Sequence, residues 1–186
     1  MKPWALALLA TAACDAPDEA CGGEGLAVLP EAVQFGDVRP RAADDPGDPA
    51  RLDQVPTRRV VLLRNTCAAP LTLTEICLIA DAHNGDAADP AFFLELPAQT
   101  RLAAGETAAV RVTYDHLVPN ADADLDGERD PDAAILVIQS SAAGTPTRVV
   151  PVCGRIVPEG EEATPTDCPP PFTIPRGEAI ADLCSR

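Results

Sequence analysis

Apolar and polar residues alternate along most of the middle of this chain. Gly, Pro, Asn and Asp separate the alternating runs, and no stretch keeps a helical period for more than a turn or two. The pattern predicts an all-β protein with seven strands, the number that a Greek-key β-sandwich requires. The seven runs are 26–35, 58–64, 71–79, 91–96, 107–114, 134–140 and 147–152.

A series of short phrases within residues 26–157 resembles the immunoglobulin-like domains called ASH or choice-of-anchor D. The phrases are VQFGDV at 33–38, VVLLRNTC at 60–67, PLTLTEI at 70–76, AFFL at 91–94, LAAGE at 102–106, VRVTY at 110–114, and the closing runs at 134–141 and 149–154. The resemblance implies a seven-stranded immunoglobulin-like β-sandwich that serves adhesion, assembly or surface display. It implies no catalytic activity and fixes no ligand residues.

The chain departs from this family at three single positions and in two loops. Cys67 stands where the family has a turn glycine, His116 where it has a proline, and Ile156 where it has a closing glycine. The loops at 39–57 and 115–132 are also longer than usual. These departures concern the loops, so the sandwich itself is still expected.

The N-terminus has the organisation of an export signal. Lys2 precedes an apolar run at 4–10, and two small residues come directly before Cys14. The run is much shorter than the roughly 20 apolar residues of a membrane-spanning helix, so it predicts a cleaved signal peptide at 1–13. The junction resembles a bacterial lipobox, although Thr11 replaces the usual Leu. We therefore expect lipidated Cys14, a linker at 14–25 and an exported protein anchored in the bacterial cell envelope, periplasmic or surface-facing.

Ordinary signal cleavage after the small-x-small triplet at 10–12 is the alternative to lipidation. The cysteine count favours lipidation, because removing Cys14 from the seven cysteines leaves an even number. An even number in an exported protein predicts up to three disulfides with fifteen possible connectivities. No CxxC spacing indicates zinc or a redox pair. The candidates are Cys21, Cys67, Cys77, Cys153, Cys168 and Cys184.

The expected strand order indicates how these cysteines pair. Cys21 and Cys67 fall near one end of the sandwich, and Cys77 and Cys153 finish strands that point to the other end. A strand between the last two could hold their Cα atoms beyond the roughly 4.4–6.8 Å that a bridge spans. Cys168 would then pair with Cys184 in a short irregular C-terminal tail at 158–186. The start of the tail is rich in charge and proline, as in a linker, whereas its apolar end could dock on the sandwich.

Acidic residues outnumber basic ones by 29 to 14, which gives a formal net charge of -15. Such a chain repels phosphate backbones, so nucleic acid is not an expected partner. The topology gathers the loops after the first, third and fifth strands at one end, which predicts an acidic pole far from the lipid anchor. Its acidic residues are Asp44, Asp45, Asp48, Asp53, Asp81, Asp86, Asp89, Asp115, Asp122, Asp124, Asp126, Glu128, Asp130 and Asp132.

One acidic loop contains a DxDxDG motif. Calcium binds six to eight oxygens, and alternate carboxylates before a glycine let a tight loop wrap one ion. Ala133 stands where an EF-hand has its bidentate Glu, and strands flank the loop. Calcium is therefore a possible cofactor, and a solvated acidic loop is the alternative. The candidate metal ligands are Asp122, Asp124, Asp126, Glu128, Asp130 and Asp132.

Catalytic motifs are weak in this sequence. His83 and His116 are the only histidines, and Ser140 and Ser141 lack the Gly-x-Ser-x-Gly context of a nucleophile. We therefore expect a non-catalytic envelope lipoprotein that binds protein or glycan through its sandwich. A structural accessory subunit of an envelope assembly, bound through a sandwich edge, is the alternative. A small envelope hydrolase with a carboxylate site is a third possibility.

Overall fold

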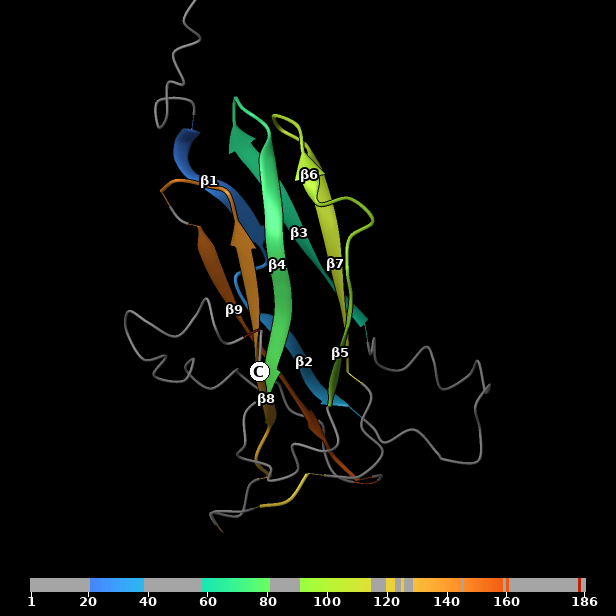
Figure 1. Cartoon of the computed structure of the whole chain (residues 1–186). Helices are drawn as coiled ribbons and strands as arrows, with labels where there is room; N and C mark the ends of the chain where they lie inside the picture. Colours follow the sequence, from blue (N-terminus) through green and yellow to red (C-terminus); the bar gives the residue numbers. More distant parts are fainter. Residues whose placement is uncertain are drawn as a thin grey trace, which may run out of the picture.

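The computed structural model describes residues 21–38, 58–80, 91–114, 120–122, 125, 129–144, 146–158, 160 and 184. Nine strands and no helix occur in these residues, and the strands form two sheets packed face to face (Figure 1). This arrangement confirms the predicted immunoglobulin-like β-sandwich, although the described residues form nine strands and not the predicted seven. The described residues contain no helix long and apolar enough to cross a bilayer.

The two sheets have four and five strands. Sheet A has the order β1 (Cys21–Leu29), β3 (Arg58–Cys67), β7 (Thr107–Tyr114), β5 (Phe92–Glu95), with every neighbouring pair antiparallel. Sheet B has the order β2 (Val33–Val38), β9 (Thr147–Ile156), β8 (Asp132–Ser140), β4 (Leu71–Ala80), β6 (Arg101–Leu102). Within sheet B only β2 and β9 run parallel.

The predicted first run at 26–35 is two strands, not one. β1 belongs to sheet A and β2 to sheet B, and Pro30 lies in the exposed turn between them. Proline has no N–H to give to a ladder, so it stands where the chain leaves one sheet for the other. Each strand buries every second side chain, but the phase changes at the turn, from Leu26 and Val28 in β1 to Val33 and Phe35 in β2. β6, with two residues, is too short to show any period.

Aliphatic side chains from both sheets fill the core, with one small aromatic cluster among them. Val61 and Leu63 of β3 and Leu136 and Ile138 of β8 belong to one cluster of buried residues. The aromatic cluster is Phe35, Phe92 and Tyr114, whose ring centroids lie 4.8 to 5.9 Å apart. The low aromatic content of the sequence therefore leaves a core built mostly of branched aliphatic residues.

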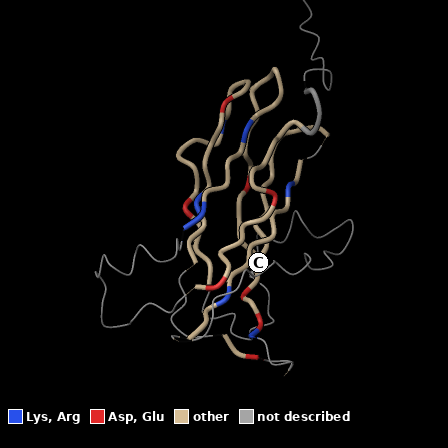
Figure 2. Tube along the Cα trace, turned by 180° about the vertical axis from the view of Figure 1, so that it is seen from behind, with Lys and Arg blue, Asp and Glu red and all other residues tan. Residues whose placement is uncertain are grey.

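Strands β2, β4, β7 and β9 end, and β3, β5 and β8 begin, at one end of the sandwich, which we call the loop end (Figure 1). The register shows this directly, because Phe92 pairs with Tyr114, Ala80 with Ala134 and Val38 with Ile156. Acidic and basic positions lie side by side here (Figure 2). Most of the predicted acidic pole lies outside the described residues, so that pole stays a prediction.

Asn65 organises the opposite end of the sandwich. Its side chain is fully buried, and its Nδ2 donates to the carbonyl oxygens of Ala69, Leu102 and Ala103 at 2.8 to 3.1 Å. Its Oδ1 accepts the N–H of Cys67 at 2.8 Å. One side chain thus satisfies four backbone groups, which gives a physical reason for the asparagine in the turn that resembles the ASH family.

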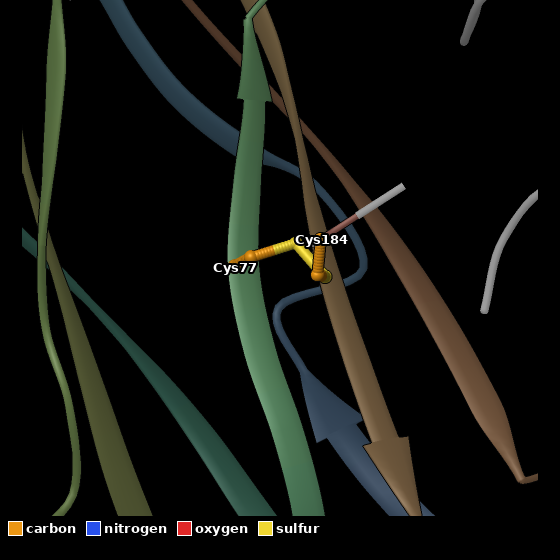
Figure 3. The surroundings of a disulfide bond; sticks show 2 residues. All are labelled: Cys77 and Cys184. Atoms are coloured by element: carbon orange, nitrogen blue, oxygen red, sulfur yellow. A yellow bond between two sulfur atoms is a disulfide. The ribbon is translucent and has the colours of Figure 1, made fainter. Parts of the chain in front are cut away.

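A disulfide joins Cys77 of β4 to Cys184, with 5.6 Å between the Cα atoms (Figure 3). The predicted pairs Cys77 with Cys153 and Cys168 with Cys184 are therefore wrong. β8 lies between β4 and β9, so Cys77 and Cys153 stand two strands apart. Cys67 and Cys153 each take part in a disulfide bond as well. Cys21 stands opposite Cys67 in the register, and their pairing stays a prediction.

Candidate functional site

The predicted calcium ligands lie only partly within the described residues. Asp122, Asp130 and Asp132 are described, whereas Asp124, Asp126 and Glu128 lie outside the described residues. In the described part of the chain, no three His, Cys, Asp or Glu residues are grouped so as to hold a metal ion. The calcium site therefore stays a prediction.

Asp132, the first residue of β8, is joined at the loop end to Tyr114, the last residue of β7. Asp132 is 7% exposed, and its Oδ2 accepts a 2.6 Å hydrogen bond from the hydroxyl of Tyr114. Asn120 lies beside this pair, because its Oδ1 is 3.5 Å from the same hydroxyl and accepts the N–H of Ile156 at 2.7 Å. Burial, followed by the negative charge of Asp132, raises the pKa of Tyr114 well above its usual range. The hydroxyl therefore remains a hydrogen-bond donor.

A second polar pair at the loop end joins β2 to β9. Arg155 donates from Nε and Nη2 to the two carboxylate oxygens of Asp37, at 2.8 and 3.0 Å. The Asp37 side chain is 1% exposed and that of Arg155 is 13% exposed. Arg155 also donates to the backbone carbonyl of Arg129. The guanidinium of Arg129 in turn donates to the backbone carbonyl of Asn120. These groups hold neighbouring segments to one another, which is a structural role.

The centre of the outer face of sheet B is covered, whereas Thr74 of β4 is exposed. Ile135 and Val137 of β8 alternate with the core residues Leu136 and Ile138, so they point away from the core. They are nevertheless buried, at 4% and 0% exposed. Cys77 pairs with Val137 in the register, and its disulfide holds Cys184 against this face (Figure 3). The apolar residues on this side of the molecule are therefore not available to a partner.

The outer face of sheet A is different, because its apolar residues are open. Along β3 the inward residues Val61 and Leu63 are fully buried, whereas the outward residues Val60 and Leu62 are 45% and 44% exposed. Leu62 pairs with Leu29 of β1, which is 59% exposed, and with Ala109 of β7. Phe93 of β5 is 48% exposed on the same side. We call this surface the A face: Leu29, Val60, Leu62, Phe93 and Ala109.

Arginine side chains border the A face. Arg58 and Arg64 are exposed on β3, two positions before Val60 and two positions after Leu62. Arg111 of β7 pairs with Val60 in the register. It also forms a 2.6 Å ion pair with Glu95 of β5, in which the two side chains are 45% and 56% exposed. The apolar surface is thus framed by positive charge.

The sequence contains one signal for an apolar outer face on sheet A. Residues 60–63 are four consecutive apolar residues, and such a run in a strand places apolar side chains on both faces of the sheet. One face fills the core, so the other face had to be either covered or exposed. What packs against the outer face decides which, and a local sequence pattern does not show that.

Ser140 and Ser141 support turns of the backbone. Ser140 is buried, and its Oγ accepts a hydrogen bond from the N–H of Ala142 at 3.3 Å. The Oγ of Ser141 accepts the N–H of Thr72 at 2.9 Å. Both hydroxyls therefore satisfy backbone amides. His83 and His116 lie outside the described residues.

No protein-family model matches the chain, and no curated protein is similar to it in sequence. Solved structures with a similar arrangement include a protein of unknown function from Porphyromonas gingivalis W83, with 18% identity over 70% of this chain and 46% of that one and a TM-score of 0.44. This chain thus spans less than half of that structure.

Two further solved structures have a similar arrangement. The ASH/PapD-like domain 7 of human CEP192 has 12% identity over 73% of this chain and 87% of that domain, with a TM-score of 0.47. The chaperone–tip adhesion subunit pre-assembly complex CsuC–CsuE of Acinetobacter baumannii has 11% identity over 70% and 56%, with a TM-score of 0.41. The assignment of an immunoglobulin-like β-sandwich rests on the strand order of this chain.

Proposed function

We propose that this protein is a non-catalytic protein-binding module of the bacterial cell envelope, and that it binds its partner through the A face. The exposed apolar side chains of β1, β3 and β5 on one side of sheet A carry this proposal. Leu29 and Leu62 are direct neighbours in the register, and exposed apolar residues that gather on one face of a folded domain mark an interaction site. Strands of a rigid sandwich also present that surface in a fixed geometry, which lowers the entropic cost of binding.

The contrast between the two outer faces supports the same proposal. Ile135 and Val137 on sheet B are buried, whereas Val60 and Leu62 on sheet A are open. Aliphatic side chains on the open face favour a protein partner over a glycan, because sugars offer mainly hydroxyl groups. An accessory subunit bound through a sandwich edge is the alternative, since β1 and β5 are the edges of sheet A. It would require backbone pairing with a partner strand.

The proposed location follows from the N-terminal signal and is supported by the disulfide chemistry. A disulfide between Cys77 and Cys184 is typical of an exported protein in an oxidising compartment. We propose that residues 1–13 are removed, that Cys14 is lipidated and that the sandwich is displayed from the envelope membrane. No catalytic role is part of this proposal.

Calcium binding at 122–132 is a separate proposal, supported by the DxDxDG spacing. Calcium should raise the melting temperature of the mature protein, and Asp124→Asn with Asp126→Asn should abolish that rise. Magnesium serves as the control, because it prefers an octahedral site with several waters. A melting temperature that calcium does not change would contradict the site.

Site-specific cross-linking in the producing cells tests the binding face. A photo-reactive amino acid replaces Leu62 at the centre of the A face, and a control variant carries it at Thr74, which is exposed on β4 of sheet B. We expect a discrete protein adduct at position 62 and none at 74. Equal adducts at both positions, or no adduct at 62, would overturn the proposal.

A further inference from the structure

We propose that the partner presents acidic side chains around an apolar centre to the A face, so that its carboxylates pair with Arg58, Arg64 and Arg111. This inference rests on the proposed function and adds the chemistry of the partner. The observation behind it is that a strongly acidic chain places three arginines around its open apolar surface.

The strand register sets the positions of these three arginines, which we call the arginine frame. On β3 the outward positions run Arg58, Val60, Leu62, Arg64. A strand rises about 3.3 Å per residue, so the two arginine Cα atoms stand roughly 20 Å apart with the apolar residues between them. Arg111 flanks Val60 from β7. A strand or extended segment of about six residues would therefore reach from one terminal arginine to the other.

The charge of this face is opposite in sign to that of the whole protein. The outward residues of β3, β7 and β5 include three arginines against one glutamate, Glu95, a difference of two positive charges. The chain as a whole carries -15. Arg59 is not part of the frame, because its guanidinium lies 5.5 Å over the ring of Phe35 in the core layer.

Arginine is suited to recognising carboxylates. Its planar guanidinium donates two parallel hydrogen bonds to one carboxylate, and such charge-assisted pairs are shorter and stronger than neutral ones. The ion pair of Arg111 with Glu95 is exposed, and an exposed pair contributes little. Glu95 can therefore exchange its arginine with a carboxylate of the partner at small cost, while Val60 and Leu62 supply the apolar contact.

A second copy of this chain fits the A face poorly. In a two-fold symmetric contact each copy presents the same patch to the other. The arginine frames would then face each other, and like charges across an interface oppose association. A membrane is also a poorer occupant, because an anionic lipid surface attracts the three arginines but repels the net negative charge of the whole protein. The observations favour a different, acidic protein.

Matched peptides test the partner chemistry with the full mature protein. Fluorescein-labelled peptides alternate Leu with Glu, Leu with Lys or Leu with Gln, and binding is measured by fluorescence anisotropy. We expect the Glu peptide to bind at least tenfold more tightly than the Lys and Gln peptides. In R58E/R64E this preference should disappear or reverse, while the control R101E on β6 should keep it. Arg101 is exposed and belongs to sheet B.

Several outcomes would overturn the inference. These are equal affinity for the three peptides, binding to none of them, an unchanged preference in R58E/R64E, or stronger binding to phosphatidylglycerol vesicles than to the Glu peptide. Repeating the cross-linking at position 62 in the R58E/R64E background separates the two proposals. An adduct that persists there retains the A face as the binding site and rejects the acidic partner. Absence of the adduct in the parent protein rejects the binding face itself.

Discussion

Tyr114 lies against the backbone of Gly154, and this contact leaves no space for a side chain. A Cβ built at Gly154 would stand 2.6 and 2.8 Å from two ring carbons of Tyr114 and 3.1 Å from the Cβ of Phe35. Because the ring is held on the other side by Phe92 and by the bond to Asp132, it cannot move away freely. Close packing of this kind resists even one added methyl group.

We therefore expect Gly154→Ala to lower the free energy of unfolding by about 1–3 kcal/mol, the usual cost of overpacking a core. Urea denaturation monitored by circular dichroism measures the change. Gly144→Ala is the matched control, because a Cβ there meets no atom within 4 Å. Equal stability of the two variants would show that the Tyr114 ring is free to shift.

Tyr114 is the only tyrosine in the chain, so the near-ultraviolet absorbance of tyrosinate reports on this residue alone. Burial and the adjacent carboxylate of Asp132 raise its pKa in the folded protein. We expect no tyrosinate signal as the pH passes about 10, the ordinary pKa, and a normal titration in concentrated urea.

The sign of the stability effect follows from the direction of this shift. The pKa of Tyr114 is raised by folding, so its contribution to stability is complete below the unfolded-state pKa of about 10 and is lost as the pH rises above it. Stability measured by denaturation should therefore fall from about pH 9 to 11. Tyr114→Phe should show a smaller fall. Tyrosinate forming near pH 10 in the folded protein would mean that the hydroxyl is open to solvent.

At the scale of strands, the local hydrophobic pattern predicted where most strands lie along the chain. It did not predict which of the two sheets each strand joins. β3, β7 and β9 appear where alternation indicated them, because each buries every second side chain in one core. The run 26–35 predicts one strand because both halves alternate with period two, although the phase changes by one residue at Pro30, from Leu26 and Val28 to Val33 and Phe35. Alternation reports burial and carries no information about which sheet a strand joins.

The cysteine pairing failed for a different reason. The strand between Cys77 and Cys153 was expected and is present as β8, but the sequence pattern did not show that residue 184 lies beside β4. The even cysteine count indicated disulfides, and the actual partner of Cys77 came from the far C-terminus. The A face was missed because its exposure depends on what covers each sheet, which is a property of the assembled sandwich.

The Cys77–Cys184 disulfide spans 107 residues of chain, so it restricts the unfolded state strongly. In the chain-entropy model a loop of this length stabilises the fold by roughly 4–5 kcal/mol, and removal of natural disulfides commonly costs about 2–5 kcal/mol. We expect Cys77→Ser with Cys184→Ser to lower the unfolding free energy within that range. Each single variant should lose a similar amount, because each removes the same bond.

Denaturation curves and intact masses of the three variants check this expectation. The masses confirm that the remaining cysteines stay oxidised, which excludes a rearranged disulfide as the cause. If the double variant were as stable as the parent, Cys184 would contribute nothing to the sandwich, and the burial of Ile135 and Val137 would need another explanation.

At the scale of the whole molecule, charge and anchor have opposite effects at a membrane. A net charge of -15 repels the protein from anionic lipid surfaces, so electrostatic attraction cannot keep it there. Retention would depend on the lipid that we propose at Cys14, because each buried methylene of an acyl chain contributes about 0.8 kcal/mol. The proposed A face would then be held at the membrane through the N-terminal segment and remain open to a partner.

We expect Cys14→Ser to move the protein from the membrane fraction to the soluble envelope fraction in the producing bacterium. High salt should not release the parent protein, because a lipid anchor is insensitive to screening whereas electrostatic adsorption is not. Cys77→Ser is the control for a general effect of losing a cysteine, and it should stay with the membrane. If Cys14→Ser also stayed with the membrane and salt released it, a protein contact would hold the chain there, and the positively framed A face would be the first surface to test by substitution.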